Sequence, residues 1–276
     1  MARMRFQGRT VFITGASSGI GAALAQRFAA DGARLILTAR RLDKLRDVAA
    51  SLPDPGAAQV IACDVTRDGD LESTVTRVRE AGGSIDVVIA NAGFGVAGNV
   101  QDLSLADYRR QFETNVFGVL RTVQATLDEL RRTRGQLVII GSVAGHIPQA
   151  GASAYGMSKF AVRALAESLR MELAPQGIAV TLISPGFVDS DIRRVDNHGV
   201  LHEHAREPVP AWLRVPADRA AREIVRAIHN KQRERIVTGH GKFLVFAYRC
   251  FPWVIRAVQR AGIKGRSEPR STYRRT

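Results

Sequence analysis

Cysteine is scarce in this 276-residue sequence, and the two cysteines, Cys63 and Cys250, lie far apart with no CxxC or metal-ligand spacing. That usage fits two reduced thiols and argues against a disulfide framework. Long hydrophobic runs are also missing, because no segment reaches the roughly 18 consecutive apolar residues of a membrane-spanning helix. The first eight residues carry charges but no apolar stretch, so we expect no secretory signal there. Internal repeats and low-complexity linkers are absent as well, and the length favours one large domain.

Negative charge is in short supply, since 26 Asp and Glu stand against 40 Lys and Arg, for a formal net charge of +14. Residues 1–230 hold 28 basic and 24 acidic side chains, whereas residues 231–276 hold 12 and 2. A basic tail fits nucleic-acid phosphates, an anionic membrane surface or a solvated face without a partner. Hydrophobic residues at 45% and charged residues at 24% are ordinary globular values and exclude a wholly disordered chain.

Short apolar runs alternate with longer segments that have helical spacing of apolar residues. The predicted strands are Thr10–Thr14, Arg34–Thr38, Gln59–Ala62, Val87–Ala90, Gln136–Ile140, Ala179–Ile183 and Arg235–Val237. The predicted helices are Ile20–Ala30, Leu42–Ser51, Leu71–Ala81, Tyr155–Leu173 and Leu105–Leu130, the last long enough for two helices. This alternation predicts an α/β, doubly wound fold with a seven-stranded parallel sheet covered on both faces, and ligands at the carboxyl ends of the strands.

A glycine-rich turn, TGASSGIG, directly follows the first predicted strand and opens the first helix. Glycines allow a tight turn and a close backbone approach, and the N-terminus of the helix offers free N–H groups to a pyrophosphate. A glycine turn alone is weak evidence, but strand, turn and helix together predict a dinucleotide site. The residues expected to bind it here are Gly15, Ser17, Ser18, Gly19, Ile20 and Gly21.

The second predicted strand runs into Thr38-Ala39-Arg40-Arg41. NAD-binding proteins commonly have an acidic residue at this place, against the 2′-hydroxyl of the adenine ribose. A guanidinium group instead binds a 2′-phosphate through charge-assisted hydrogen bonds, so the sequence favours NADP(H) over NAD(H), with Arg40 first and Arg41 second. The alternative is that both arginines merely face solvent.

Two further segments follow predicted strands, namely Asp64-Val65 after the third strand and Asn91-Ala92-Gly93 after the fourth. Because ligands of such folds lie at the strand ends, we expect both segments beside the adenine and its ribose. Asp64 has an alternative role in the N-terminal cap region of the next helix.

Tyr155 and Lys159 are four residues apart at the start of a helical pattern, which places both side chains on one helix face. A tyrosine with an ordinary pKa of ~10 is a poor acid at neutral pH, and lowering the pKa by about three units takes roughly 4 kcal/mol of phenolate stabilisation. An adjacent ammonium and the charge of an oxidised nicotinamide can supply it. Ser142 follows the fifth strand and Asn115 lies in the preceding helical region.

TGASSGIG, NAG, Asn115, Ser142, the YxxxK pair and Pro185-Gly186 occur together in the order and spacing of the short-chain dehydrogenase/reductase (SDR) family. The chain strongly resembles this family over residues 10 to about 240, and the combination is far more specific than any single motif. The resemblance implies a seven-stranded Rossmann sheet, a nicotinamide cofactor and the interconversion of alcohol and carbonyl groups.

The resemblance also assigns roles to the motif residues. Tyr155 gives a proton to the carbonyl oxygen during reduction, while Lys159 lowers the pKa of Tyr155, and both contact the cofactor, Lys159 through the nicotinamide ribose. Ser142 orients and polarises the carbonyl, and Asn115 distorts its helix and holds a water that links Lys159 to solvent. The nicotinamide pocket is expected to include Pro185, Gly186, Val188 and Ser190, the last a serine where the family usually has threonine.

Several residues that flank the expected reacting centre are apolar or aromatic: Phe94, His146, Ile147, Pro148 and Phe187. They favour an apolar or amphipathic carbonyl compound over a small sugar, and we expect substrate contacts from Phe94, His146 and Phe187 in addition to Ser142 and Tyr155. The alternative is that these side chains only pack the fold.

Residues 187–216 break the βα alternation and are interpreted as a loop that covers the substrate, with a simple mobile loop as the alternative. Their histidines, His198, His202 and His204, have no partner at metal-ligand spacing, so no metal site is expected. We therefore divide the chain into a Rossmann dinucleotide-binding and catalytic domain at residues 1–240 and a basic, aromatic, amphipathic C-terminal extension at residues 241–276.

The extension contains FLVFAYRCFPWVIRAV at residues 243–258, which is too short and too charged to span a bilayer. Its aromatic residues, flanked by Lys242, Arg260, Lys264 and Arg266, fit a segment that lies on an anionic membrane surface. An equally good interpretation is a helix that packs over the substrate pocket or against a dimer partner. Nucleic acid is the least favoured partner, because no groove-reading motif is present.

Together these features predict an NADP(H)-dependent oxidoreductase that interconverts a carbonyl and a secondary alcohol on a hydrophobic or lipid-like substrate, such as a 3-oxoacyl, 3-ketosphingoid or steroid-like compound. The alternative is a dinucleotide-sensing or scaffold protein without turnover. We expect a cytoplasmic homodimer or homotetramer, either free or peripheral at the cytoplasmic face of the membrane.

Overall fold

Seven strands form a single parallel sheet in the computed structural model, which describes residues 4–197, 200, 202, 207 and 209–264. The strand order is β3-β2-β1-β4-β5-β6-β7. The strands are β1 (Thr10–Thr14), β2 (Arg34–Ala39), β3 (Ala58–Ala62), β4 (Val87–Ala90), β5 (Gln136–Ile140), β6 (Ala179–Ser184) and β7 (Glu234–Ile236). Every neighbouring pair is parallel, so the predicted doubly wound sheet is confirmed.

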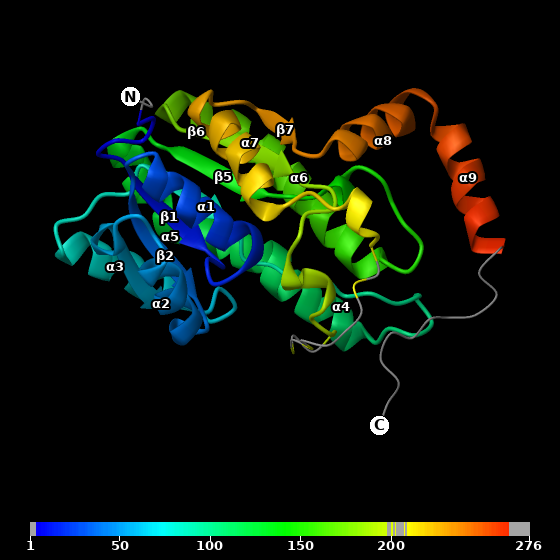
Figure 1. Ribbon diagram of the computed structural model, residues 1–276, viewed down its shortest axis with the longest axis horizontal. Helices are drawn as coiled ribbons and strands as arrows, with labels where there is room; N and C mark the ends of the chain where they lie inside the picture. Colours follow the sequence, from blue (N-terminus) through cyan, green and yellow to red (C-terminus); the bar gives the residue numbers. More distant parts are fainter. Residues whose placement is uncertain (1–3, 198–199, 201, 203–206, 208, 265–276) are drawn as a thin grey trace.

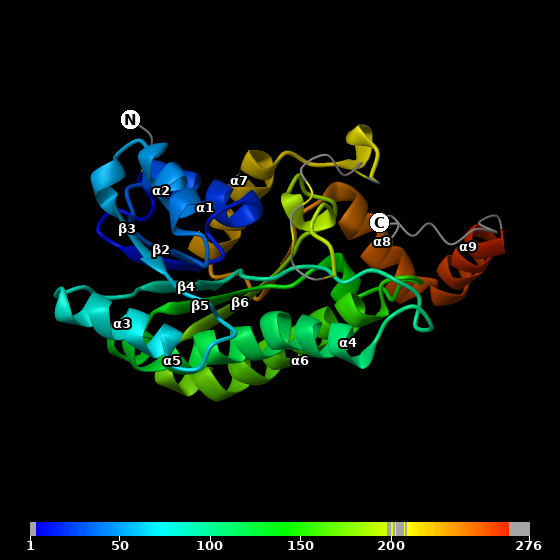
Figure 2. The same cartoon turned by 90° about the horizontal axis from the view of Figure 1, so that it is seen from below.

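Helices cover both faces of the sheet (Figures 1 and 2). One face carries α1 (Gly19–Ala30), α2 (Leu42–Ala50) and α7 (Ala217–His229). The other carries α3 (Asp70–Glu80), α4 (Leu105–Phe112), α5 (Gly118–Thr133) and α6 (Ser153–Leu173). Strand side chains alternate between the two cores, because Val11 and Ile13 pack on the first face and Phe12 on the second. This two-sided burial explains why the strands read as continuous apolar runs.

As far as β7, the predicted elements match the observed ones to within about two residues, with two differences. The helix predicted at Leu105–Leu130 is α4 and α5, joined by the π-helical turn Glu113–Phe117. The sequence interpretation missed α7 entirely, although its apolar residues recur at helical spacing and pack into the first core.

The C-terminal helices α8 (Gly239–Cys250) and α9 (Pro252–Lys264) follow β7 and extend beyond one end of the sheet (Figure 1). Val245 of α8 is 2% exposed and packs with Val143 and Ile147, which follow β5. Gln259 of α9 donates a hydrogen bond to the backbone oxygen of Pro148 (3.0 Å). Both helices therefore contact the segment that connects β5 to α6.

None of the helices in the described part of the chain is long and apolar enough to cross a bilayer.

The chain reverses its direction of sheet growth at β1 and β4, which are neighbours in the sheet although two strands separate them in sequence. The loops that leave these two strands diverge to opposite faces and open a crevice at the carboxyl ends. Four segments lie at this edge of the sheet and line the crevice: the glycine-rich turn, Asn91-Ala92-Gly93, and the segments after β5 and β6.

Candidate active site

The glycine-rich turn is held against the end of β4 by a small hydrogen-bond network. Asn91 Nδ2 donates to the backbone oxygens of Thr14 (2.9 Å) and Gly15 (3.0 Å), and Thr14 Oγ1 accepts from the N–H groups of Asn91 (3.0 Å) and Ala92 (3.1 Å). Gly15 has φ +65°, and a Cβ there would lie 2.8 Å from Ala92 Cα. Glycine is thus required both by the dihedral angle and by the space. The bracing role of Thr14 was not predicted.

The loop after β6 meets the same turn from the other side. A Cβ on Gly19, which has φ +54°, would lie 3.0 Å from Ser190 Cβ. A Cβ on Gly21 would lie 2.7 Å from Asn91 Nδ2, so this glycine packs closely against Asn91. Ser18 is the N-cap residue of α1 but its hydroxyl makes no capping hydrogen bond. The predicted glycine, serine and Ser190 contacts therefore lie around one helix N-terminus, the kind of site that binds phosphate.

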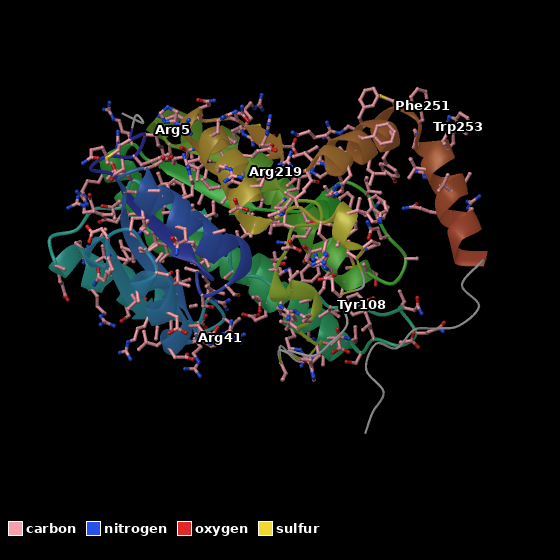
Figure 3. All side chains as sticks on the ribbon, viewed as in Figure 1. Arg5, Arg41, Tyr108, Arg219, Phe251 and Trp253 are labelled. Carbon is pink, nitrogen blue, oxygen red and sulfur yellow. The ribbon has the colours of Figure 1, made fainter. Side chains whose placement is uncertain are left out.

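The two arginines after β2 are both exposed. Arg41 Nη2 lies 3.5 Å from Ser17 Oγ of the glycine-rich turn, and Figure 3 labels Arg41 beside α2. Arg41 therefore reaches toward the phosphate-binding turn, while Arg40 has its side chain in solvent. The sequence ranked Arg40 first, whereas the observed contact belongs to Arg41.

Asp64 and Val65 follow β3 as predicted. Asp64 Oδ1 accepts hydrogen bonds from the backbone N–H (3.0 Å) and Oγ1 (2.8 Å) of Thr66, which forms a local turn. The N-cap of α3 is Gly69, so the alternative that Asp64 caps this helix is wrong. Val65 is 7% exposed and packs in the second core.

Asn115 lies in the π-helical turn between α4 and α5, which confirms the expected helix distortion. Both its amide oxygen and its amide nitrogen make hydrogen bonds within the protein. Oδ1 accepts from the Phe94 N–H (3.1 Å), while Nδ2 donates to the Phe94 oxygen (3.0 Å) and to Ser158 Oγ (3.2 Å). Gln111 supports the same segment, since Oε1 accepts from the Val96 N–H (2.6 Å) and Nε2 donates to the Phe94 oxygen (2.9 Å). No sequence signal pointed to Gln111.

Tyr155 and Lys159 lie on one face of α6, as their spacing predicts. Lys159 Nζ is 5.8 Å from the centroid of the Tyr155 ring and donates to the backbone oxygen of Ile140 at the end of β5 (2.9 Å). Lys159 is 6% exposed, and this burial lowers its pKa to about 8. The Lys159 ammonium thus lies over the face of the Tyr155 ring, and the Ile140 oxygen compensates only part of its positive charge.

The pKa of Tyr155 is raised rather than lowered in this structure. Burial of the ring is the largest cause, while a hydrogen bond with Ser142 and the positive charge of Arg193 act in the opposite direction. Lys159 is not among the groups that lower it. The expected lowering of the Tyr155 pKa by Lys159 is therefore not seen, and burial outweighs the contacts with Ser142 and Arg193 that do lower this pKa.

Ser142 lies at the carboxyl end of β5, beside the loop that follows β6. Its Oγ accepts a hydrogen bond from the Ala144 N–H (3.1 Å) and lies 3.5 Å from the backbone oxygen of Pro185. The same Pro185 oxygen accepts from the Val143 N–H (2.9 Å). Ser142, Tyr155 and the Pro185-Gly186 segment are therefore brought together, as the motifs predict.

His146 does not fit the predicted role of a substrate contact. It is 5% exposed, and its Nε2 lies 3.0 Å from Ser184 Oγ and 3.1 Å from Glu234 Oε1 of β7. The hydrogen bond with His146 lowers the pKa of the Glu234 carboxyl below its ordinary value. We therefore assign His146 to the packing of the segment after β5 against β7.

Phe187 is held by the first turn of α8. Its ring stacks on His240, with centroids 5.5 Å apart and an interplanar angle of 22°, and its N–H donates to His240 Nε2 (3.2 Å). Burial lowers the pKa of His240, which favours the neutral ring that this acceptor role requires. Thr238 Oγ1 lies 3.2 Å from the same nitrogen. No sequence pattern linked His240 to this loop.

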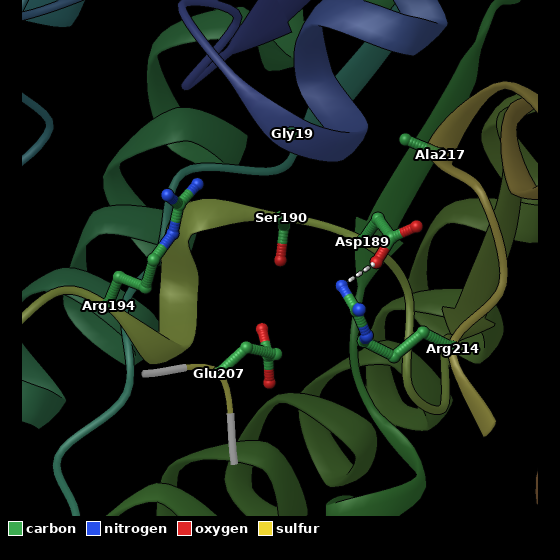
Figure 4. Close-up of a pocket in the computed structure, with 7 residues that line it drawn as sticks. All are labelled: Gly19, Asp189, Ser190, Arg194, Glu207, Arg214 and Ala217. Carbon is green, nitrogen blue, oxygen red and sulfur yellow. Dashed lines mark hydrogen bonds and ion pairs between the residues drawn. The ribbon is translucent and has the colours of Figure 1, made fainter. Parts of the chain in front are cut away.

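A cavity of about 530 Å³ opens between the glycine-rich turn and the loop after β6 (Figure 4). Gly19 and Ser190 mark its two sides, and its remaining lining is mostly charged: Asp189, Arg194, Glu207, Arg214 and Ala217. Arg214 Nη1 pairs with Asp189 Oδ1 (2.7 Å), and Glu207 Oε1 pairs with Arg193 Nε (2.6 Å). This polar lining belongs to the phosphate side of the crevice and was not predicted.

The predicted loop at residues 187–216 is described only in part. Val188 is 2% exposed and forms an isolated parallel bridge with Val215, so the ends of the loop are tied together. His202 Nε2 lies 2.8 Å from Asp196 Oδ2, whereas His198 and His204 lie outside the described residues. The described residues contain no group of three or more His, Cys, Asp or Glu side chains placed to hold a metal ion.

Comparison with known proteins identifies the family. The model of the short chain dehydrogenase family matches residues 9–200. The chain is 32% identical over 263 residues to 11-beta-hydroxysteroid dehydrogenase A of Sesamum indicum, a match that covers 90% of this chain and 75% of the relative. It is similar to an alcohol dehydrogenase structure from the archaeon Thermococcus sibiricus complexed with 5-hydroxy-NADP, with a TM-score of 0.72, 30% identity and coverage of 83% and 95% of the two chains. A short chain dehydrogenase/reductase structure from Burkholderia phymatum in complex with NAD, at 23% identity, shares the fold with a TM-score of 0.78 over 89% and 94%.

Proposed function

Because the chain belongs to the short-chain dehydrogenase family and is an oxidoreductase of that class, we propose that it uses NADP(H) to interconvert a carbonyl and a secondary alcohol on a hydrophobic substrate. The observation that carries the proposal is the grouping of Ser142, Tyr155 and Lys159 at the carboxyl end of β5, beside the glycine-rich turn. A protein that only binds a dinucleotide has no chemical need for this arrangement.

Each of the three side chains has a distinct task in the proposed reduction. Ser142 donates a hydrogen bond to the carbonyl oxygen and orients it, and the Tyr155 hydroxyl gives that oxygen its proton. Lys159, whose ammonium donates to the Ile140 oxygen at the end of β5, would hold the nicotinamide ribose. The hydrogen bond with Ser142 and the charge of Arg193 favour the phenolate left behind. The bound nicotinamide supplies the hydride in this direction and, once oxidised, a positive charge. Oxidation of the alcohol runs the same transfers in reverse.

The cofactor fits the residues around the first helix N-terminus. Gly15 and Gly19 let the turn pack closely against Ala92 and Ser190, because a Cβ at either position would lie within 3.0 Å of a neighbouring atom. The backbone N–H groups at the start of α1 then remain open to a pyrophosphate. Arg41, 3.5 Å from Ser17 Oγ, and the exposed Arg40 offer guanidinium groups to a 2′-phosphate. The Thermococcus sibiricus alcohol dehydrogenase, complexed with 5-hydroxy-NADP, supports the same preference. Asp64 and Asn91 would lie by the adenosine half.

The substrate side of the proposal rests on two half-buried aromatic residues, Phe94 and Phe187, at the edges of the catalytic group. The name of the Sesamum indicum relative, whose match covers 90% of this chain, points to a steroid for that protein. We therefore favour a ketone or aldehyde attached to a large apolar skeleton. The apolar residues Phe117, Met157 and Phe160, exposed on the helical layer that holds α5 and α6, fit a homodimer or homotetramer.

The first test replaces Tyr155 by phenylalanine. The variant should still bind NADPH, measured by quenching of nucleotide fluorescence, but its carbonyl-dependent NADPH oxidation should fall by at least about 100-fold, because the proton donor is gone. Tyr248→Phe, a half-buried tyrosine of α8, is the matched control and should keep its activity. Unchanged turnover in Tyr155→Phe would refute the mechanism. If the unmodified protein binds the nucleotide but turns over none of a set of acyl, sphingoid, steroid and aromatic ketones, the result would favour a dinucleotide-sensing protein.

The second test concerns the cofactor. Changing Arg40 or Arg41 to aspartate should weaken NADPH binding by about 10- to 100-fold, the value of a hydrogen bond to a charged group, while NADH binding stays the same or improves. Arg46→Asp, at an exposed position of α2, makes the same change in net charge away from the turn. An unmodified protein that already prefers NADH would refute the NADP(H) assignment.

A further inference from the structure

Large apolar side chains are exposed along the two C-terminal helices. Phe243 and Phe246 of α8 are 69% and 62% exposed, and Trp253 and Val258 of α9 are 71% and 64% exposed, with Phe251, at 51%, in the turn between the helices. Figure 3 shows Phe251 and Trp253 at the outer edge of the molecule, away from the sheet. We call these five residues the α8–α9 surface. Exposure of several large apolar side chains on two consecutive helices marks a surface that contacts another phase or molecule.

The opposite side of α8 is packed against the protein. Gly241 and Val245 are buried, and Val245 contacts Val143 and Ile147 beside the catalytic Ser142. The hydrogen bond from Gln259 to the Pro148 oxygen fixes α9 to the same segment. The apolar residues of the α8–α9 surface therefore face outward from helices whose inner sides are already occupied.

Positive charge surrounds the apolar residues. Lys242, Arg249, Arg256 and Arg260 are exposed on the same two helices, and the sequence has no acidic residue between Glu234 and Glu268. The ion pairs found among described residues hold Lys242 to Glu223 (3.3 Å) and Arg249 to Glu234 (3.8 Å), but none involves Arg256 or Arg260. The α9 part of the surface is thus both aromatic and cationic without compensating carboxylates.

We propose that the α8–α9 surface docks onto an anionic lipid surface. Aromatic rings favour the boundary between headgroups and acyl chains, and basic side chains next to them pair with lipid phosphates. A second copy of the chain is a poorer fit, because pairing the same surface across a two-fold axis would bring uncompensated arginines together. Nucleic acid would match the charge but leave the phenylalanine and tryptophan side chains without an apolar partner.

Docking at this place would bring lipid close to the catalytic group. The segment Val143–Gly145, which α8 covers, directly follows Ser142. An apolar carbonyl compound dissolved in the membrane would then reach the site along α8 rather than through water. This consequence rests on the proposed reaction, whereas the docking itself does not and is measured without turnover.

The first experiment uses tryptophan fluorescence of the full chain. The sequence has two tryptophans, so Trp212→Phe leaves Trp253 as the only reporter. Vesicles of phosphatidylcholine with about 30% phosphatidylglycerol, enough to give a strongly negative surface potential, should shift its emission to the blue, and bromine atoms on the acyl chains should quench it. Unchanged emission would overturn the proposal. A blue shift that depends on protein concentration without vesicles would also overturn it, in favour of a second copy of the chain.

The second experiment is co-sedimentation with the same vesicles. Phe246→Glu and Trp253→Glu should each weaken binding by about ten-fold or more, since each removes apolar contact and adds a repelled charge. Arg256→Gln with Arg260→Gln should weaken it by about 25-fold, or about five-fold for each basic residue. Met171→Glu, at a 72% exposed apolar position of α6, is the control and should bind normally. Equal binding of all variants, or equal binding to pure phosphatidylcholine, would overturn the proposal.

Discussion

Replacing Lys159 by methionine should reveal the cost of burying its charge. The lysine is 6% exposed, and burial lowers its pKa from 10.5 to about 8. Between these two values the unfolded chain holds a proton that the folded chain has released, so the free energy of unfolding rises with pH across this window. At about 1.4 kcal/mol per unit, the folded protein carries a penalty of about 3 kcal/mol below pH 8 that disappears toward pH 10.5.

The assay compares urea unfolding of the wild type and Lys159→Met at several values of pH. The free energy of unfolding of the variant minus that of the wild type should fall by about 2–3 kcal/mol between about pH 7 and pH 10, because only the wild type gains stability as this lysine loses its proton. All other titrating groups cancel in the difference. The lost hydrogen bond to the Ile140 oxygen adds an offset at every pH. Lys44→Met, at an exposed position of α2, should give a flat difference. A flat difference for Lys159→Met as well would refute the argument that desolvation dominates at this site.

Two other substitutions test the supports of the site. Gly15→Ala should lower the free energy of unfolding by about 1–3 kcal/mol and weaken nucleotide binding, since it adds a strained φ and a contact with Ala92. Gly82→Ala, with φ +71° and open space around it, isolates the dihedral strain, so an equal loss in both variants would contradict the steric argument. Glu234→Gln should cost about 1 kcal/mol at neutral pH, with the difference disappearing as pH falls below the ordinary carboxyl value of 4.5, because a lowered pKa gives stability only while the group is ionised. A loss that persists in acid would show that the charge of Glu234 is not what holds His146.

The sequence was most informative where local pattern and structure coincide. The seven strands follow from apolar runs, and the grouping of Tyr155 with Lys159 follows from helical spacing, which needs no knowledge of the rest of the chain. The same kind of pattern marks α7, whose apolar residues pack into the first core. That helix was predictable from local pattern and was missed because it directly follows the irregular loop, whose prolines and scattered charges mask where helical spacing resumes.

Contacts between distant residues were not predictable in the same way. His146 and Glu234 are far apart in sequence, and only the packing of the segment after β5 against β7 makes them partners. The raised pKa of Tyr155 likewise depends on how deeply the ring is buried, which spacing on a helix does not determine. The ion pair between Arg214 and Asp189 likewise depends on how the loop folds back on itself, which the local pattern does not show. The local sequence pattern predicts which residues lie on a given strand or helix face. Tertiary packing determines which of their atoms come into contact.

The contact between Phe187 and His240 changes where the catalytic unit ends. A protein shortened before Gly239 would lose the acceptor of the Phe187 N–H, the ring stacked on it and the Val245 side chain that packs over Val143. A loss of activity in such a truncation would therefore not test lipid binding, because internal contacts are lost as well. Point substitutions on the outer face of α8 test lipid binding without removing these contacts. The contact between Phe187 and His240 also couples α8 to the loop expected to hold the nicotinamide, so any displacement of this helix would move that loop.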